Sequence, residues 1–131
     1  MNKENLNKMA DHLDGDGGSE LNMRQFCNCV VGRSLRVIEH MKGNWNHQWV
    51  AGATERMFGI PDERWSPLWM FLFGGDWPND PHLAAVRLRY VAQHGDAPSK
   101  DQWDRFRNVQ APAVAEVDEP EYKAEHEEAC A

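Results

Sequence analysis

The stretch NMRQFCNCVVGRSLRVIEHMK, residues 22–42, is the longest cleanly periodic segment of the sequence. Successive residues of an α-helix lie about 100° apart around its axis. On that spacing, one half of the circumference is apolar or small, formed by Phe26, Cys27, Val30, Val31, Ser34, Leu35, Val37, Ile38 and Met41. Asn22 suits the N-cap, and Gly43 suits the position that follows a helix. So wide an apolar surface needs several neighbours to cover it, and it therefore predicts the central helix of a small bundle.

The two cysteines of this stretch are separated by one residue. On a helix, Cys27 and Cys29 would point about 200° apart, so they could not hold one metal ion together. Cys27 would lie in the core, and Cys29 would lie on the polar face with Arg33 and Arg36, beside the flat surface left by Gly32. Cations near a thiol favour the thiolate. We therefore expect Cys29, Arg33 and Arg36 to form an exposed edge that contacts a partner.

Helix signals recur on both sides of the central stretch. Apolar residues at helical spacing, or capping pairs such as Ser66–Pro67 and Asp80–Pro81, mark residues 2–13, 46–58, 62–73, 81–94 and 100–109. The sequence thus predicts an all-α fold: a small single-domain helical bundle of about five helices over residues 1–110. An acidic C-terminal tail, residues 111–131, follows it.

Two of these segments carry more specific expectations. The cluster WSPLWMFLF, residues 65–73, is the most hydrophobic part of the chain, and we expect it in the core, with a partner-binding patch as the alternative. In residues 81–94 a face of small residues suits close helix packing: Ala84, Ala85, Leu88, Val91 and Ala92. Arg87 and Arg89 are expected to face solvent or an acidic partner.

No motif in the sequence predicts a metal or a cofactor. The loop DGDGGSE, residues 14–20, resembles a calcium loop at first sight. Aligned from Asp14, however, it places Gly18, Ser19 and Gln25 where an EF-hand needs a ligand, a glycine and a bidentate glutamate. His40 and His47 with Cys29 have no zinc-ligand spacing. We therefore expect no catalytic constellation, no metal site and no cofactor.

The charge of the chain is uneven. The formal net charge is −7, and residues 113–131 carry seven acidic side chains against one lysine. A clustered acidic tail can occupy a surface that is meant for nucleic acid, although simple solubility is the competing explanation. The candidate partner-binding residues of the tail are Glu119, Glu121, Glu125, Glu127 and Glu128.

The ordering of motifs resembles a family of small uncharacterised helical proteins of phages, prophages and bacteria, over about residues 6–96. The likeness lies in LNMRQFCNCVVGRS, residues 21–34, with its cysteine-bearing helix, and in LFGGDWPNDPHLAAVRLRYVAQHG, residues 72–95. Members often have a histidine after the glycine of the cysteine helix, whereas Arg33 follows Gly32 here. The resemblance implies a helical fold and a phage context, but no activity.

Three functions compete on these observations. We expect a non-enzymatic interaction protein, phage-encoded and acting in the host cytoplasm. It would bind and inhibit a host protein or ribonucleoprotein complex, for example as an anti-CRISPR inhibitor.

The second candidate function is a nucleic-acid-binding module. It would use Arg24, Arg33, Arg36, Arg87 and Arg89, although no helix gathers a basic recognition surface. The third is an enzyme with Cys29 as nucleophile and His40 or His47 as base. No segment has the length and apolarity of a membrane span.

Overall fold

The computed structural model describes residues 1–43, 45 and 52–107. The described part is helical and contains no strand, as the sequence predicts. Its α-helices are α1 (Lys3–Asp14), α2 (Val30–Ile38), α3 (Ala53–Phe58), α4 (Pro67–Phe73) and α5 (Pro81–His94), and its 3₁₀-helices are η1 (Asp16–Glu20) and η3 (Lys100–Phe106). None of these helices is long and apolar enough to cross a membrane. The tail and the boundary at residue 110 lie outside the described residues.

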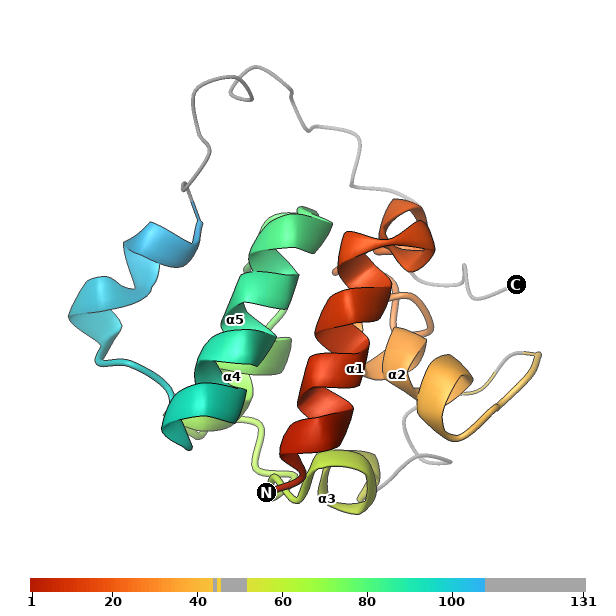
Figure 1. Cartoon of the computed structure of the whole chain (residues 1–131), viewed down its shortest axis with the longest axis horizontal. Helices are drawn as coiled ribbons and strands as arrows, with labels where there is room; N and C mark the ends of the chain where they lie inside the picture. The colour runs from red at the N-terminus through yellow and green to blue at the C-terminus, as the bar shows by residue number, and fades with distance from the viewer. Residues whose placement is uncertain (44, 46–51, 108–131) are drawn as a thin grey trace.

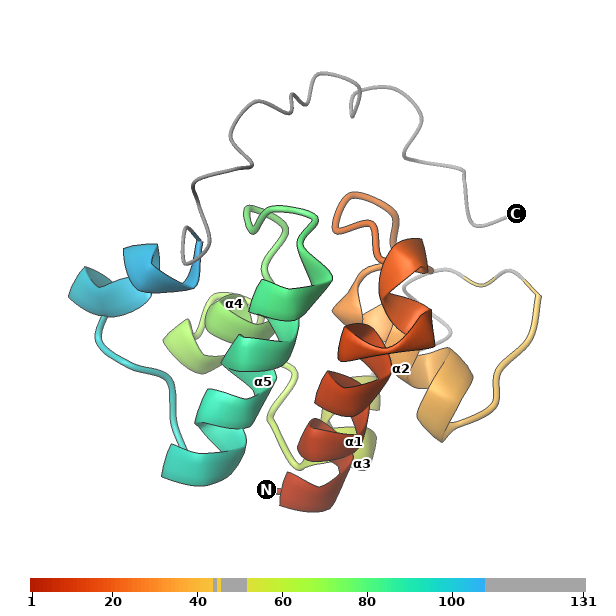
Figure 2. The ribbon, with the colours of Figure 1, turned by 45° about the horizontal axis from the view of Figure 1, so that its top comes forward.

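The pair of α1 and α5 forms the centre of the fold, and the two helices lie side by side (Figures 1 and 2). Asn2 caps α1, where its side chain accepts a hydrogen bond from the backbone N–H of Asn5. Asp80 caps α5 in the same way, with Pro81 in the first turn. The predicted apolar positions of α1 and the predicted small face of α5 are all buried: Leu6, Met9, Ala10 and Leu13, and Ala84, Ala85, Leu88, Val91 and Ala92.

The segment 22–42 differs from the prediction, because only Val30–Ile38 is α-helical. Residues 22–29 form consecutive turns in which the N–H of Asn28 donates to the carbonyl of Gln25 and the N–H of Asn22 donates to the carbonyl of Asn28. The N-cap position is occupied by Cys29 rather than Asn22. The helix ends well before Gly43.

Gly32 explains why the turns can fold back on this helix. A Cβ at this position would lie 2.2 Å from the carbonyl oxygen of Phe26 and 2.3 Å from the carbonyl carbon of Cys27. The turn backbone therefore rests directly on the helix surface at Gly32. The sequence predicts a flat exposed surface at Gly32, but the missing side chain instead makes room for the chain's own backbone.

The aromatic core lies between α4, α5 and η3. Phe71 of α4 contacts the rings of Trp77, Tyr90, Trp103 and Phe106, with centroid distances between 4.9 and 6.1 Å. Trp103 and Phe106 are buried, and the helix predicted over residues 100–109 is a 3₁₀-helix over Lys100–Phe106. The predicted helix over 46–58 is confirmed only for α3, since residues 46–51 lie outside the described part.

Arg87 is not on the surface, contrary to the prediction. Its side chain is fully buried, and its guanidinium lies 4.2 Å from the centroid of the Trp77 ring. Burial, with the nearby Arg107, lowers the pKa of Arg87 to about 9. The tertiary structure explains the burial: Trp77 lies against the guanidinium, and Nη1 donates to the carbonyl of Phe106 in η3, which lies beside α5 (Figures 1 and 2).

Candidate functional site

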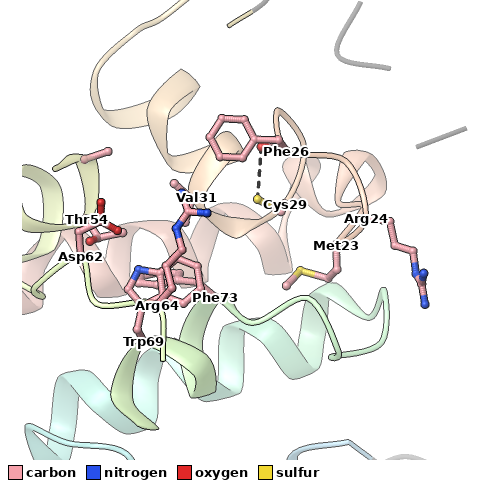
Figure 3. A pocket seen from close by; sticks show the side chains of 11 residues that line it. Met23, Arg24, Phe26, Cys29, Val31, Thr54, Asp62, Arg64, Trp69 and Phe73 are labelled. Carbon is pink, nitrogen blue, oxygen red and sulfur yellow. Dashed lines mark hydrogen bonds between the residues drawn. The ribbon is translucent and has the colours of Figure 1, made fainter. Parts of the chain in front are cut away.

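A cavity of about 250 Å³ opens between the 22–29 turns, the start of α2, α3 and α4 (Figure 3). Segments far apart in the sequence build it, so no local motif marks it. Most of its wall is apolar, and a few polar side chains lie among the apolar ones. The lining residues are Met23, Arg24, Phe26, Cys29, Val31, Ala53, Thr54, Asp62, Arg64, Trp69 and Phe73.

The wall contributed by α4 consists of Trp69 and Phe73. They are four residues apart and so share one face of the helix, with their ring centroids 5.4 Å apart in an edge-to-face contact. Phe73 also stacks on Phe58 of α3 at 5.7 Å. Ser66 starts α4 by accepting a hydrogen bond from the N–H of Trp69, which sets the orientation of this face. The wall is thus held from two helices.

One polar atom of this wall has no hydrogen-bond partner among the described residues. The indole nitrogen Nε1 of Trp69 is shielded from solvent and donates to no acceptor in the part of the chain that the structure describes. Buried donors are normally satisfied, because leaving one unpaired is unfavourable. An acceptor placed in the pocket by a bound molecule can supply the missing hydrogen bond.

The charged groups of the lining are two guanidinium groups and one carboxylate. Arg64 lies 5.8 Å from the centroid of the Trp69 ring, and Arg24 is exposed on the turn segment. The carboxylate of Asp62 accepts a hydrogen bond from the backbone N–H of Gly52, just before α3. Thr54 donates its hydroxyl to the carbonyl of Ile60, so its donor is used within the fold.

Cys29 contributes a neutral thiol to the pocket rather than a thiolate. Its side chain is buried, and Sγ donates to the carbonyl oxygen of Phe26 at 3.3 Å (Figure 3). Burial raises the pKa of this thiol, and this effect outweighs the backbone N–H groups of Val31 and Gly32 and the charge of Arg64, which act in the opposite direction. The expectation that Cys29 lies on an exposed face is therefore wrong.

The histidines proposed as a catalytic base do not complete a site. His40 lies beyond the end of α2, at a positive φ of 58°, and is not part of the pocket lining. His47 lies outside the described residues. Nucleophilic catalysis needs a base within hydrogen-bond reach of an activated nucleophile, and the described surroundings of Cys29 supply neither.

The other two residues of the predicted edge lie elsewhere. Arg33 is buried, with Nη1 3.0 Å from the carboxylate of Glu20 and Nη2 3.2 Å from Nε2 of His12. It therefore joins α2 to η1 and α1. Arg36 is partly buried, with its guanidinium 4.5 Å from the centroid of the Trp45 ring. Cys29, Arg33 and Arg36 thus form no common exposed edge, because Cys29 precedes α2 and the two arginines are covered by η1, α1 and Trp45.

His12 is held close to Arg33 in its neutral form. Burial and the charge of Arg33 lower its pKa below the ordinary value of 6.5, against the opposing effect of Glu20 and Asp16. A Cβ on Gly17 would lie 1.8 Å from Nε2 of His12, so the glycine allows η1 to cover the ring. The carboxylates of Asp14, Asp16 and Glu20 are exposed, while Gly17 and Gly18 are buried and Glu20 pairs with Arg33.

The cluster of residues 65–73, expected in the core, is buried at Phe71, Leu72 and Phe73, but Trp65 is the most exposed aromatic side chain of the described residues. Trp65 is 87% exposed, and the only other large hydrophobic residue exposed in the described part is Met1, at 45%. Trp65 precedes the cap residue Ser66, so it lies outside the buried face of α4. It adjoins Arg64 in the sequence, and Arg64 lines the pocket. The capping pair Ser66–Pro67 was the available signal, since it places Trp65 before the helix.

The glutamates proposed as partner-binding residues, Glu119, Glu121, Glu125, Glu127 and Glu128, lie outside the described residues. No protein-family model, characterised protein or solved structure matches this chain.

Proposed function

We propose that this protein is a non-enzymatic interaction module that binds a partner macromolecule through Trp65 and the pocket that Arg64 lines. The observation that carries the proposal is the exposure of Trp65, whose neighbour in the sequence, Arg64, lines an apolar cavity. Tryptophan is enriched among the residues that dominate binding energy at interfaces. Exposed indole surface is also unfavourable in water, so a partner that covers it gains affinity.

The pocket lined by Arg64 and Trp69 supports the same function. Interface anchors of a partner typically fill such pockets at the centre of a contact. Trp65 also lies two residues from Pro67 at the start of α4, so a short connection to a helix limits its range of positions. Restricting an anchor before binding reduces the entropy lost on association.

The narrower role is also a proposal, and it rests on the sequence resemblance. In this role the protein is phage-encoded, acts in the host cytoplasm, and inhibits a host protein or ribonucleoprotein complex such as a CRISPR effector. The acidic tail would contribute Glu119, Glu121, Glu125, Glu127 and Glu128 to that contact.

The alternative of a nucleic-acid-binding module has little support from the arginines proposed for it. Arg33 and Arg87 are buried. Arg89 pairs with the carboxylates of Asp11 and Asp14 on α1. Phosphate recognition needs several accessible cations on one surface, and these side chains are used inside the fold.

Affinity capture tests the proposal. The tagged full-length protein is incubated with bacterial lysate, and the captured proteins are identified by mass spectrometry for the wild type, Trp65→Ala and the control Lys8→Ala. Lys8 is exposed on α1 and does not line the pocket. We expect Trp65→Ala to lose at least about 2 kcal/mol of binding free energy, which is about 30-fold in affinity, and Lys8→Ala to bind like the wild type.

Two further measurements make the result interpretable. Thermal unfolding of Trp65→Ala should match the wild type, because exposed substitutions change stability by about 0.5 kcal/mol or less. A full-length variant with glutamine at positions 119, 121, 125, 127 and 128 tests the tail separately. A specific partner that binds Trp65→Ala as tightly as the wild type would refute the proposed interface.

A further inference from the structure

We propose that η3 is a releasable strap over Arg87, and that an oxyanion holds it open by accepting hydrogen bonds from Nε and Nη2 of this arginine. The inference goes beyond the proposed function and does not involve Trp65. Three observations carry it: the guanidinium of Arg87 is a buried charge, two of its donor nitrogens lack an acceptor in the described part of the chain, and η3 covers it from the edge of the fold.

The donor nitrogens of Arg87 are partly satisfied. The side chain is fully buried, and Nη1 donates to the carbonyl oxygen of Phe106 at 3.4 Å. Nε and Nη2 are shielded from solvent and have no acceptor within residues 1–43, 45 and 52–107. The N–H bonds of these two nitrogens point the same way along one edge of the planar guanidinium. That edge matches the two oxygens of a carboxylate or a phosphate, which arginine binds in a bidentate manner.

The guanidinium remains a positive charge inside the protein. Burial and the charge of Arg107 lower the pKa of Arg87 to about 9, so the group is still protonated at pH 7. The charge of Asp80 acts in the opposite direction, but Oδ1 of this carboxylate accepts hydrogen bonds from backbone N–H groups at the start of α5. The Trp77 ring, at 4.2 Å, supplies a cation–π contact. Because a buried charge without an ionic partner is unfavourable, covering Arg87 destabilises the docked position of η3.

The strap itself lies beside α5 at the edge of the molecule (Figures 1 and 2). A non-helical connection joins it to α5. Trp103 and Phe106 anchor it on Phe71, with ring centroids 5.5 and 4.9 Å from that of Phe71. The indole nitrogen of Trp103 donates to the carbonyl of Pro98, within the same segment, so this hydrogen bond does not tie η3 to the helices. Aromatic burial therefore favours docking, and the charge of Arg87 opposes it.

These opposing effects make release of η3 a local opening of the native protein. Segments held by few buried contacts open without global unfolding. On release the guanidinium becomes hydrated, and the edge formed by Nε and Nη2 becomes accessible. An oxyanion that pairs with this edge binds the released state and not the docked one, so it shifts the population towards release.

Amide hydrogen exchange followed by nuclear magnetic resonance tests the proposal on the full-length protein. A short 3₁₀-helix is not stable alone, so release exposes backbone N–H groups such as those of Gln102 and Arg107, which donate to the carbonyls of Ser99 and Asp104. The N–H groups of α5 report global unfolding and serve as the internal reference. The probes are sodium acetate and sodium phosphate, each compared with sodium chloride at the same pH and ionic strength.

We expect exchange in η3 to be faster than in α5 and to rise with the concentration of acetate or phosphate. The rise is about threefold where the oxyanion reaches about twice its dissociation constant for the released state. Arg87→Met removes the buried charge, so exchange in η3 should become about fivefold slower relative to α5, and the response to oxyanions should disappear. Arg105→Gln is the matched control, because Arg105 is an exposed arginine of η3 itself. It should respond like the wild type.

The salt comparison needs no variant, and equal exchange of wild-type η3 in chloride, acetate and phosphate would overturn the oxyanion site. Acceleration that persists in Arg87→Met would also overturn it, because the oxyanion would then act elsewhere. Exchange in η3 as slow as in α5, or equally fast in Arg87→Met and the wild type, would refute the strap. A response to acetate alone supports a carboxylate ligand, and a response to phosphate alone supports a phosphate ligand.

Discussion

Replacement of Gly32 by alanine distinguishes two descriptions of the segment 22–42, because they predict opposite signs. In one continuous helix, Gly32 would be an interior residue, and Gly32→Ala would stabilise the protein by about 1 kcal/mol. In the observed structure the turn backbone of residues 26–27 rests on this position. The same substitution then places a methyl group against the protein backbone.

The expected magnitude follows from the distances. The new Cβ would lie 2.2 Å from the carbonyl oxygen of Phe26, and 2.3 and 2.5 Å from the carbonyl carbon and oxygen of Cys27. Favourable contacts between such atoms need about 3.5 Å, so the turn must move by roughly 1 Å. Overpacking of this kind costs about 1–3 kcal/mol. With three backbone atoms in the way, we expect a net loss of about 2 kcal/mol after the gain in helix propensity.

Urea unfolding followed by tryptophan fluorescence measures this change as a shift of the midpoint at constant slope. Gly75→Ala is the matched control, because a Cβ there has no heavy atom closer than 3.9 Å and the residue has no positive φ. It should be neutral or stabilise by about 0.4–1 kcal/mol through the unfolded chain. If Gly32→Ala stabilises the protein as much as Gly75→Ala, residues 22–29 do not fold back on α2 and the described pocket loses one wall.

Three other substitutions probe charges within the fold. Arg87→Met should change the free energy of unfolding little or raise it by about 1 kcal/mol, because Met fills the volume without burying a charge. Arg87→Ala leaves a cavity and should lower the free energy of unfolding by about 2–4 kcal/mol. Equal losses for the two variants in urea unfolding would contradict this expectation. The pKa of His12 is lowered in the native state, so the unfolded chain binds a proton that the native protein lacks, and stability should fall as pH decreases through about 6.5. His12→Gln should flatten this part of the curve, and parallel curves for both proteins would exclude the assignment. Arg89→Gln removes the ion pairs to Asp11 and Asp14 and should cost about 0.5–1 kcal/mol at low salt and less at about 0.5 M salt; a salt-independent loss would argue against ion pairing as the cause.

Local patterns predicted much of the helical framework. The capping residues Asp80 and Ser66, each followed by proline, mark helix starts that the structure confirms. The glycines Gly59 and Gly95 end helices at positive φ. These signals depend on a few neighbouring residues, so they can be recognised without knowledge of the fold.

The candidate site could not be predicted in the same way. The pocket combines residues of the 22–29 turns, α3 and α4, whose proximity is a property of packing. If residues 22–42 were one helix, Cys29 and Arg33 would lie on its exposed face. In the structure both side chains are buried. The helical spacing of apolar residues is correct over Val30–Ile38. Residues 22–29 instead form turns, and a helical wheel does not describe the directions of side chains in turns.

The sequence by itself determined the helical class, most helix ends, and the apolar faces of α1 and α5, because periodicity, caps and glycines act over one or two turns of chain. Only the tertiary structure decided which polar side chains are accessible. Arg87 is enclosed because Trp77 and the end of η3 lie against it, and Arg33 is enclosed because η1 brings Glu20 to it. Trp65 stays exposed because it lies just before the cap of α4. Burial is a property of all the neighbours of a residue, and those neighbours come from distant parts of the chain.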